Sequence, residues 1–205
     1  MQDMQISEEE PAGLRERKRQ RTRETIARVA LELFERQGFQ ETTIPQIAAA
    51  ADVSPRTVSA YFPHKEDLAF PDAELEFEAF DARMRERSPD ETAIDALSAF
   101  IRATVEEAGE RASERQARRR VIRADDALSA HEHRYMRRVQ EIIAAGVARD
   151  LGVSADALEP RMAAAATLTV FDLLGEDYKS ADPAEALAVM DRALLFIGGG
   201  ISALR

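Results

Sequence analysis

Apolar residues recur along this chain at a spacing of three and four positions, which is the period of one face of an α-helix. The first such stripe consists of Ile26, Ala30, Leu33 and Phe34. Gly38 follows at the place where a left-handed residue ends many helices. The pattern predicts a first helix that starts at Arg15 or Arg21 and ends at Gln37. No stretch shows the apolar and polar alternation of a half-buried strand, so we expect an all-α fold.

Two short helices are expected next, each preceded by a capping residue. Thr43 and Gln46 have the spacing of a capping box, in which the threonine oxygen accepts from the Gln46 N–H and Gln46 reaches back. Ser54 followed by Pro55 is the usual order of an N-cap and a first helical residue. Asp52 occupies the tight turn between them, and aspartate tolerates a positive φ better than most residues. This is the layout of a helix-turn-helix.

Longer helices are expected after Pro63, which ends the third helix. The apolar stripes place them at about 65–85, 91–108, 114–124, 131–151, 157–178 and 183–197. We expect the glycine run 198–200 to end or soften the last of them. The chain is thus divided into a disordered tail over 1–14, a helix-turn-helix domain over 15–68, and a second helical domain over 69–205.

Composition excludes several classes of protein. The chain has 205 residues, of which 45% are hydrophobic, and this is enough for an ordinary core. It contains no cysteine, which excludes disulfide scaffolds, thiolate zinc sites and cysteine nucleophiles. No apolar run reaches the roughly 18 residues of a membrane helix, and no apolar signal block is present near the N-terminus. We therefore expect a cytoplasmic protein without a membrane partner.

Charge is distributed unevenly along the chain. The net charge of −10 argues at first against a nucleic-acid partner. Residues 11–68, however, carry ten basic against eight acidic side chains, and six of these bases lie between Arg15 and Arg23. An acidic body with a locally basic N-terminal stretch keeps DNA binding open.

Residues 21–68 resemble the DNA-binding domain of TetR-family (tetracycline-repressor-like) regulators. The resemblance rests on the helix end from Phe34 to Phe39, on Thr43 followed by Ile47-Ala48, on Val53-Ser54, and on the block 61–68. It implies an all-α protein with an N-terminal three-helix DNA-binding domain over 15–68. It also implies a C-terminal helical bundle over 69–205 that binds a ligand and dimerises. The implied function is a transcriptional repressor that binds a palindromic operator in double-stranded DNA as a homodimer and is released by a small-molecule inducer.

The resemblance also implies DNA contacts at particular residues. Thr43 and Lys65 match phosphate-contacting positions, and Tyr61 matches a position that faces a base or the backbone. The start of the third helix matches the base-reading end of the motif, with Ser54, Pro55, Arg56 and Thr57. Ser59 departs from the family, which often has a tyrosine there.

Arginine chemistry supports part of this assignment independently. Arg56 is the only base in the third helix, so it is the best candidate for a bidentate guanine contact, with a phosphate clamp as the alternative. Arg21 and Arg23 belong to the basic run that also contains Arg15, Arg17, Lys18 and Arg19. This run either tracks the DNA backbone or is a solvated extension of the first helix.

Apolar residues on the middle helices are the candidates for a ligand pocket, and ordinary core packing is the alternative for each of them. They are Leu97, Phe100, Ile101, Val121, Ile122, Tyr135, Met136, Val139, Leu168 and Phe171. Residues 91–205 loosely resemble the subgroup of the mycofactocin-system regulator and other acyl-CoA-responsive proteins. An acyl-CoA or another apolar small molecule is therefore the expected inducer, and Arg118–Arg120 with Arg123 either meet its anionic head or form a solvated face.

Other side-chain groups do not support catalysis, a metal or a cofactor. His131 and His133 are two positions apart, so on a helix their side chains point in nearly opposite directions and cannot share an ion. No arrangement of side chains matches a catalytic motif. A further alternative, an all-α enzyme that kept a DNA-binding domain, would require turnover of a substrate. The alternative function is a helical protein-interaction module without specific DNA binding. Specific binding to a palindrome distinguishes the two.

Overall fold

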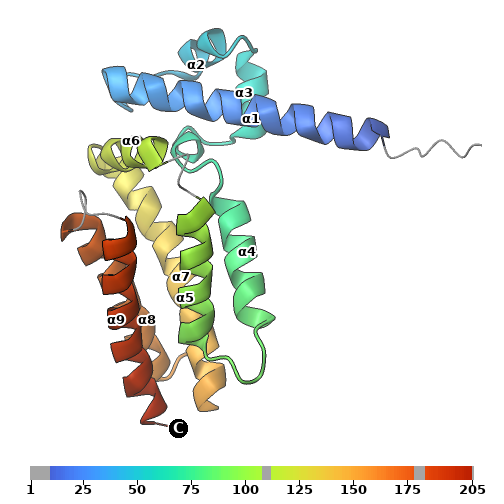
Figure 1. The fold of residues 1–205 in the computed structure, drawn as a ribbon. Helices are drawn as coiled ribbons and strands as arrows, with labels where there is room; N and C mark the ends of the chain where they lie inside the picture. The colour runs from blue at the N-terminus through green and yellow to red at the C-terminus, as the bar shows by residue number, and fades with distance from the viewer. Residues whose placement is uncertain (1–9, 108–111, 178–182, 205) are drawn as a thin grey trace, which may run out of the picture. The chain divides into compact units, whose positions relative to one another are not determined.

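The computed structural model describes residues 10–107, 112–177 and 183–204, and all its regular elements in these ranges are helical (Figure 1). The elements in chain order are α1 (Glu10–Gln37), α2 (Ile44–Ala50), α3 (Pro55–Tyr61), the 3₁₀ turn η1 (Glu66–Ala69), α4 (Ala73–Arg85), α5 (Ala93–Glu107), α6 (Ala112–Arg123), α7 (Asp126–Leu151), α8 (Leu158–Asp177) and α9 (Pro183–Ser202). The predicted all-α class is confirmed.

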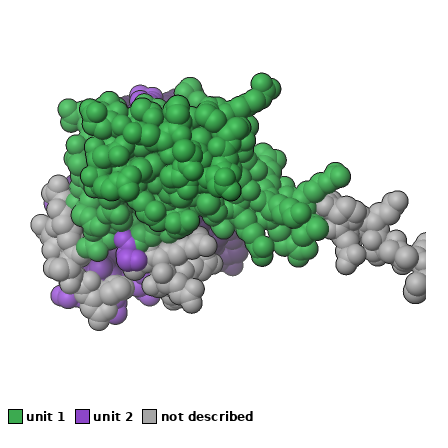
Figure 2. Space-filling model, turned by 90° about the horizontal axis from the view of Figure 1, so that it is seen from above, with its two compact units in different colours: residues 1–71, 114–130 green, residues 72–113, 131–205 purple. Residues whose placement is uncertain are grey.

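The chain forms two compact units (Figure 2). Unit 1 contains residues 1–71 together with 114–130, and unit 2 contains residues 72–113 together with 131–205. Most of α6 and the first residues of α7 therefore fold with the helix-turn-helix. The division we expected from the sequence, at residue 68, placed them in the C-terminal domain, because nothing local in an amphipathic helix indicates which core it joins.

The core of unit 1 is built on α1. Ile26, Ala30 and Phe34 are almost completely buried, as the predicted stripe requires. Around them pack Ile47 of α2 and Val58 of α3, both fully buried. Residues distant in sequence complete the same cluster, namely Ala117, Val121 and Ile122 of α6 and Leu128 of α7.

Unit 2 is a bundle of α4, α5, α7, α8 and α9 (Figure 1). Its core is made of buried side chains from each helix, among them Phe80, Leu97, Ile143, Ala164 and Leu194. Helix α9 packs on both α8 and α5. This core is separate from that of unit 1.

A buried ion pair fastens the turn between α4 and α5 to α7. The side chains of Arg87 and Asp150 are 3% and 7% exposed and form an ion pair. Arg87 also donates to the carbonyl of Gly146, and the second carboxylate oxygen of Asp150 accepts from the N–H of Ala93 at 2.8 Å. Asp150 thereby satisfies a free N–H at the start of α5, which reduces the cost of burying its charge.

The predicted turn and cap residues have the expected geometry. Gly38, Gly152 and Asp52 adopt φ angles of 87°, 67° and 54°. Thr43 and Gln46 form a complete capping box. These features are local, so the sequence alone was sufficient to predict them.

Several predicted boundaries were wrong. Helix α1 begins at Glu10, so residues 10–14 are helical; the rest of the predicted tail, residues 1–9, lies outside the described residues. The helix expected over 65–85 is broken after η1, because Pro71 disfavours a helical conformation at Phe70.

The last two corrections concern α7 and α9. Helix α7 starts at Asp126 instead of residue 131, because the carboxylate of Asp125 accepts from the N–H groups of Ala127 and Leu128. Helix α9 continues through the glycine run to Ser202, since the buried Leu194 and Ile201 anchor it on both sides of that run.

Candidate DNA-binding surface and ligand-binding core

The N-terminal end of α3 is exposed and well ordered by its cap. Ser54 Oγ accepts from the Thr57 N–H at 3.0 Å and lies 2.8 Å from Thr57 Oγ1. Pro55 occupies the first turn, where a missing N–H costs nothing. Arg56 is exposed, and within the part of the chain that the structure describes its guanidinium has no hydrogen bond or ion pair. The predicted base-reading residues are thus gathered at one accessible helix end.

Thr43 begins α2 and uses its side chain for the cap. Its Oγ1 accepts from the Gln46 N–H at 3.4 Å, while Gln46 Oε1 accepts from the Thr43 N–H at 2.8 Å. The residue remains exposed. The α2–α3 pair is closed by the Asp52 turn, and the two helices pack directly on each other.

Lys65 lies beside the end of α1 instead of at the start of a regular helix. Its Nζ donates to the Gln40 carbonyl at 3.3 Å and lies 4.2 Å from the centre of the Phe39 ring. Burial lowers the pKa of the Lys65 ammonium below its ordinary value, and the carboxylates of Glu66, Asp125 and Glu41 oppose that shift only in part. In this structure the Lys65 Nζ, for which a phosphate contact was predicted, therefore contacts the Gln40 carbonyl and the Phe39 ring of unit 1.

Arg23 has a structural role that the sequence analysis did not predict. Its Nη1 donates to the Tyr61 carbonyl at 2.9 Å, its Nη2 donates to the Pro71 carbonyl, and its guanidinium lies 4.4 Å from the centre of the Phe62 ring. Both terminal nitrogens thus donate to backbone carbonyls of unit 1. Tyr61 is half-buried and is connected to Arg23 through its backbone.

The basic run lies on a regular part of α1. Arg15, Arg17, Lys18, Arg19 and Arg21 are all exposed. The run thus extends α1 as a helix, which is compatible with both alternatives, a contact with the DNA backbone and a solvated face. Exposure leaves its positive charges accessible to a polyanion.

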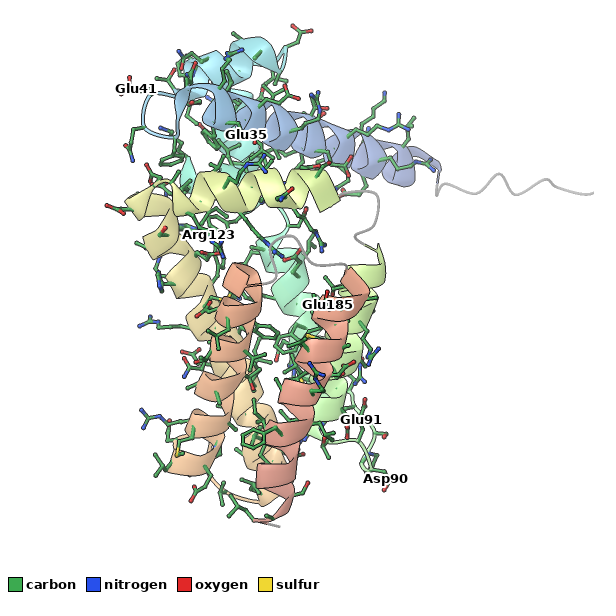
Figure 3. All side chains as sticks on the ribbon, turned by 60° about the vertical axis from the view of Figure 1, so that its left-hand side comes forward. Glu35, Glu41, Asp90, Glu91, Arg123 and Glu185 are labelled. Atoms are coloured by element: carbon green, nitrogen blue, oxygen red, sulfur yellow. The ribbon has the colours of Figure 1, made fainter. Side chains whose placement is uncertain are left out.

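Helix α6 is attached to α1 by polar bonds as well as by the shared core. Arg120 Nη2 and Glu35 Oε1 are 2.7 Å apart, and Figure 3 labels Glu35 on α1. Gln40 Nε2 donates to Asp125 Oδ2 at 2.8 Å. An open groove runs between these two pairs, lined by Phe39, Val121 and their neighbours. Sequence reasoning missed this attachment, because residues 85 positions apart carry no local signal.

Most predicted ligand-binding residues lie in one apolar region of unit 2. Leu97 is buried in the core, and the partly buried residues that pack against that core include Phe100, Ile101, Val139, Leu168 and Phe171. Two residues of α4 that we had not singled out join them. The Phe80 ring lies 5.0 Å from that of Phe100, and the Phe77 ring stacks 5.2 Å from that of Tyr135. The sequence signal that could have identified Phe77 and Phe80 is their spacing of three residues, which places both on one face of α4.

Three of the predicted ligand-binding residues, Val121, Ile122 and Met136, do not lie in this region. Ile122, like its neighbour Val121, is buried in the core of unit 1, because α6 turns its apolar face toward α1. Met136 is 37% exposed and lies outside the core cluster. The arginines of α6 are also partly occupied, since Arg118 pairs with Glu114 at 2.8 Å.

Histidine and acidic residues form no metal site in the described ranges: no group of three or more potential ligands is present there. His131 instead packs its ring edge-on against Tyr135, with the ring centres 4.9 Å apart. Among the described helices, none is long and apolar enough to cross a membrane.

Comparison with known proteins agrees with this arrangement. The family model described as "Bacterial regulatory proteins, tetR family" matches residues 26–70, and the model of the "MftR C-terminal domain" matches residues 91–202, more than half of the chain. The HTH-type transcriptional regulator TcmR of Streptomyces glaucescens is 43% identical over 93 residues, which are 45% of this chain and 41% of that protein. The match thus spans about two fifths of the length of this relative.

Solved structures share the fold at low sequence identity. Salmonella enterica GusR has a TM-score of 0.61 at 22% identity, covering 97% of this chain and 100% of that one. The complex of SmeT with triclosan has a TM-score of 0.61 at 20% identity, covering 85% and 90% of the two chains. Thermus thermophilus FadR with lauroyl-CoA has a TM-score of 0.55 at 20% identity, covering 85% and 92%.

The matched proteins have an N-terminal helix-turn-helix domain and a helical C-terminal domain. The chain belongs to the TetR family of bacterial transcriptional regulators, and its C-terminal domain is of the MftR type.

Proposed function

We propose that this regulator is a repressor that binds a palindromic DNA operator as a homodimer and is released by an apolar small molecule. The observation that carries the proposal is the exposed end of α3, where Arg56 is free of hydrogen bonds and ion pairs to the other described residues. A guanidinium without an internal partner can reach O6 and N7 of a guanine in a bidentate contact.

The neighbouring residues complete a surface of the kind that docks on DNA. Ser54, Pro55 and Thr57 surround Arg56 with small groups, which allow a close approach to base edges. Thr43 and Arg21 are exposed and available to phosphates. Tyr61 and Lys65 are half-buried, and Lys65 reaches a phosphate only if its Nζ leaves the Gln40 carbonyl. Phosphate contacts position the protein and base contacts specify the sequence.

Dimer formation is supported by the exposed apolar side chains of α8 and α9. Leu195 and Phe196 of α9 are 75% and 85% exposed, and Met162 and Leu173 of α8 are more than half exposed. Helices α8 and α9 pack side by side. Covering such residues with a second copy removes apolar surface from water. The dimer would present two α3 helices to half-sites about 34–36 Å apart or a multiple of that.

The apolar region of unit 2 is where we place the inducer. Phe77 and Phe80 of α4 contact Tyr135 and Phe100, so a ligand that enters among these rings would displace α4. SmeT is in complex with triclosan and FadR with lauroyl-CoA, and triclosan and the lauroyl chain are apolar. An acyl-CoA, through its apolar acyl chain, or another apolar small molecule is the inducer class that we propose. It acts only through a different affinity for two conformations.

The decisive experiment is selection of bound fragments from sheared genomic DNA by the purified protein, at about 0.15 M salt because phosphate contacts make binding salt-dependent. Enrichment of one inverted repeat is the expected result, and fatty acyl-CoA of several chain lengths can then be tested for release of those fragments. No enrichment by a folded dimer that has been unfolded and refolded without ligand would favour the interaction-module alternative.

The arginine of α3 is tested on the enriched repeat. Arg56→Ala should weaken specific binding by about 1–3 kcal/mol and relax the preference for one base pair, while the affinity for unrelated DNA changes little. Arg36→Ala is the control, since Arg36 is an exposed arginine of the same unit outside α3. Equal losses on specific and unrelated DNA would show that Arg56 clamps a phosphate instead.

A further inference from the structure

We propose that Arg23 is a positioning residue: it fixes the C-terminal end of α3 on α1, and it supports operator recognition through this helix without touching DNA. The inference rests on the proposed function of α3. It replaces the phosphate contact that the basic run suggested for this residue.

The guanidinium of Arg23 connects three backbone segments: α1, the end of α3, and the segment at Pro71. Nη1 of Arg23 donates to the carbonyl of Tyr61, the last residue of α3, at 2.9 Å. Nη2 donates to the carbonyl of Pro71, the last residue of unit 1 before the chain enters unit 2. The cation lies over the Phe62 ring at 4.4 Å from its centre. Arg23 therefore ties α1 to the end of α3 and to the segment after η1.

This role requires the shape of arginine. A planar guanidinium can donate to two carbonyls and stack on a ring at the same time, whereas a lysine ammonium is a point donor on a flexible stem. No ion pair forms between Arg23 and a carboxylate of the described residues, so the backbone carbonyls are its main polar partners. Nη1 and Nη2 each use one N–H on a backbone carbonyl, and these two bonds fix the plane of the guanidinium.

Helix α3 depends on such an attachment because it is short. A helix of seven residues is not stable alone and takes its orientation from its neighbours. Its far end carries Arg56, five residues before Tyr61. Recognition groups must be held within roughly 0.5 Å and 10–20° of the productive geometry. Releasing the C-terminal end of so short a helix would therefore also misplace its N-terminal end. Val58 anchors the middle of α3, and Arg23 anchors the end.

The neighbouring Arg21 provides a matched control. It lies two residues earlier on α1, has the same charge and is exposed. Phosphate contact predicts that Arg21→Gln reduces the dependence of affinity on salt, whereas positioning predicts no such effect for Arg23→Gln.

The test uses the full chain with Arg23→Gln, Arg23→Lys and Arg21→Gln. Without DNA, amide hydrogen exchange of residues 58–62 should rise at least tenfold in both Arg23 variants, and not in Arg21→Gln, while exchange in the core of α5 and α9 stays unchanged. On the operator, both Arg23 variants should lose at least tenfold in affinity with an unchanged salt slope. The affinity for unrelated duplex should remain within about twofold.

Arg23→Lys separates the two roles most clearly, because lysine preserves a phosphate contact but not a two-carbonyl clamp. Operator affinity near that of the wild type for Arg23→Lys, or a smaller salt slope for Arg23→Gln, would overturn the inference. Unchanged exchange in α3 would overturn it as well. If the wild-type protein selects no operator, the proposed function fails by itself, and the exchange measurement still decides whether Arg23 holds α3.

Discussion

Gln40 Nε2 donates a hydrogen bond to Asp125 Oδ2 across 85 positions of sequence, at 2.8 Å. The other carboxylate oxygen of Asp125 accepts from the first N–H groups of α7. One side chain thus caps a helix and holds the loop between α1 and α2. Together with the Arg120–Glu35 pair, it makes residues 114–130 part of the folded DNA-binding unit.

Ile122→Ala should destabilise unit 1 by about 2–4 kcal/mol, because Ile122 is only 5% exposed and its removal leaves a cavity next to α1. Urea unfolding followed by amide exchange in α2 and α3 measures the effect. Arg119→Ala, on the exposed side of α6, should change stability by less than about 0.5 kcal/mol. A loss confined to unit 2 would contradict the assignment of α6.

Ser54→Ala should cost about 1 kcal/mol of stability, because it leaves the Thr57 N–H at the start of α3 without its cap. It should also weaken operator binding, since the cap orders the end that carries Arg56. Thermal unfolding and operator titration measure the two effects. Ser59→Ala is the control: Ser59 is an exposed residue of the same helix, and alanine has the higher helix propensity. Equal effects of the two variants would argue against the capping role.

Lys65→Met should make the stability of the protein less dependent on pH in the alkaline range. Burial lowers the pKa of Lys65 below the ordinary value of 10.5, so the unfolded chain binds the proton more tightly than the folded protein. The charged lysine therefore costs stability at neutral pH. That cost disappears as pH rises from just below the folded pKa to above 10.5.

The measurement for Lys65 is urea unfolding of both proteins between neutral pH and the alkaline range. The wild-type protein should gain stability relative to Lys65→Met as pH rises. A relative loss would mean that the contacts with Phe39 and Gln40 raise the pKa of Lys65 more than burial lowers it.

Phe196→Asp should shift the proposed dimer toward monomer, because a charge would replace an apolar side chain that is 85% exposed in the single chain. Sedimentation at several protein concentrations measures the shift, and operator affinity should fall with it. Leu75→Asp is the control, since Leu75 is also exposed, at 56%, but lies on α4. A monomer produced equally by both variants would place the interface elsewhere.

Local features were predictable from the sequence because they depend on residues a few positions apart. The apolar stripe of α1, the Thr43–Gln46 box, the Ser54 cap and the turn at Asp52 are of this kind, and each has its expected geometry. The ordered motif of residues 21–68 was sufficient to indicate the family, because it lies in one continuous segment of the chain.

The tertiary structure decided which partners each side chain meets. Arg23 belongs to a basic run by sequence, but its position opposite two carbonyls makes it a clamp. Ile122 lies on an apolar stripe that would suit either core, and packing assigned it to unit 1. Helical periodicity specifies that a face is buried and leaves open what buries it, because the partner comes from a distant part of the chain.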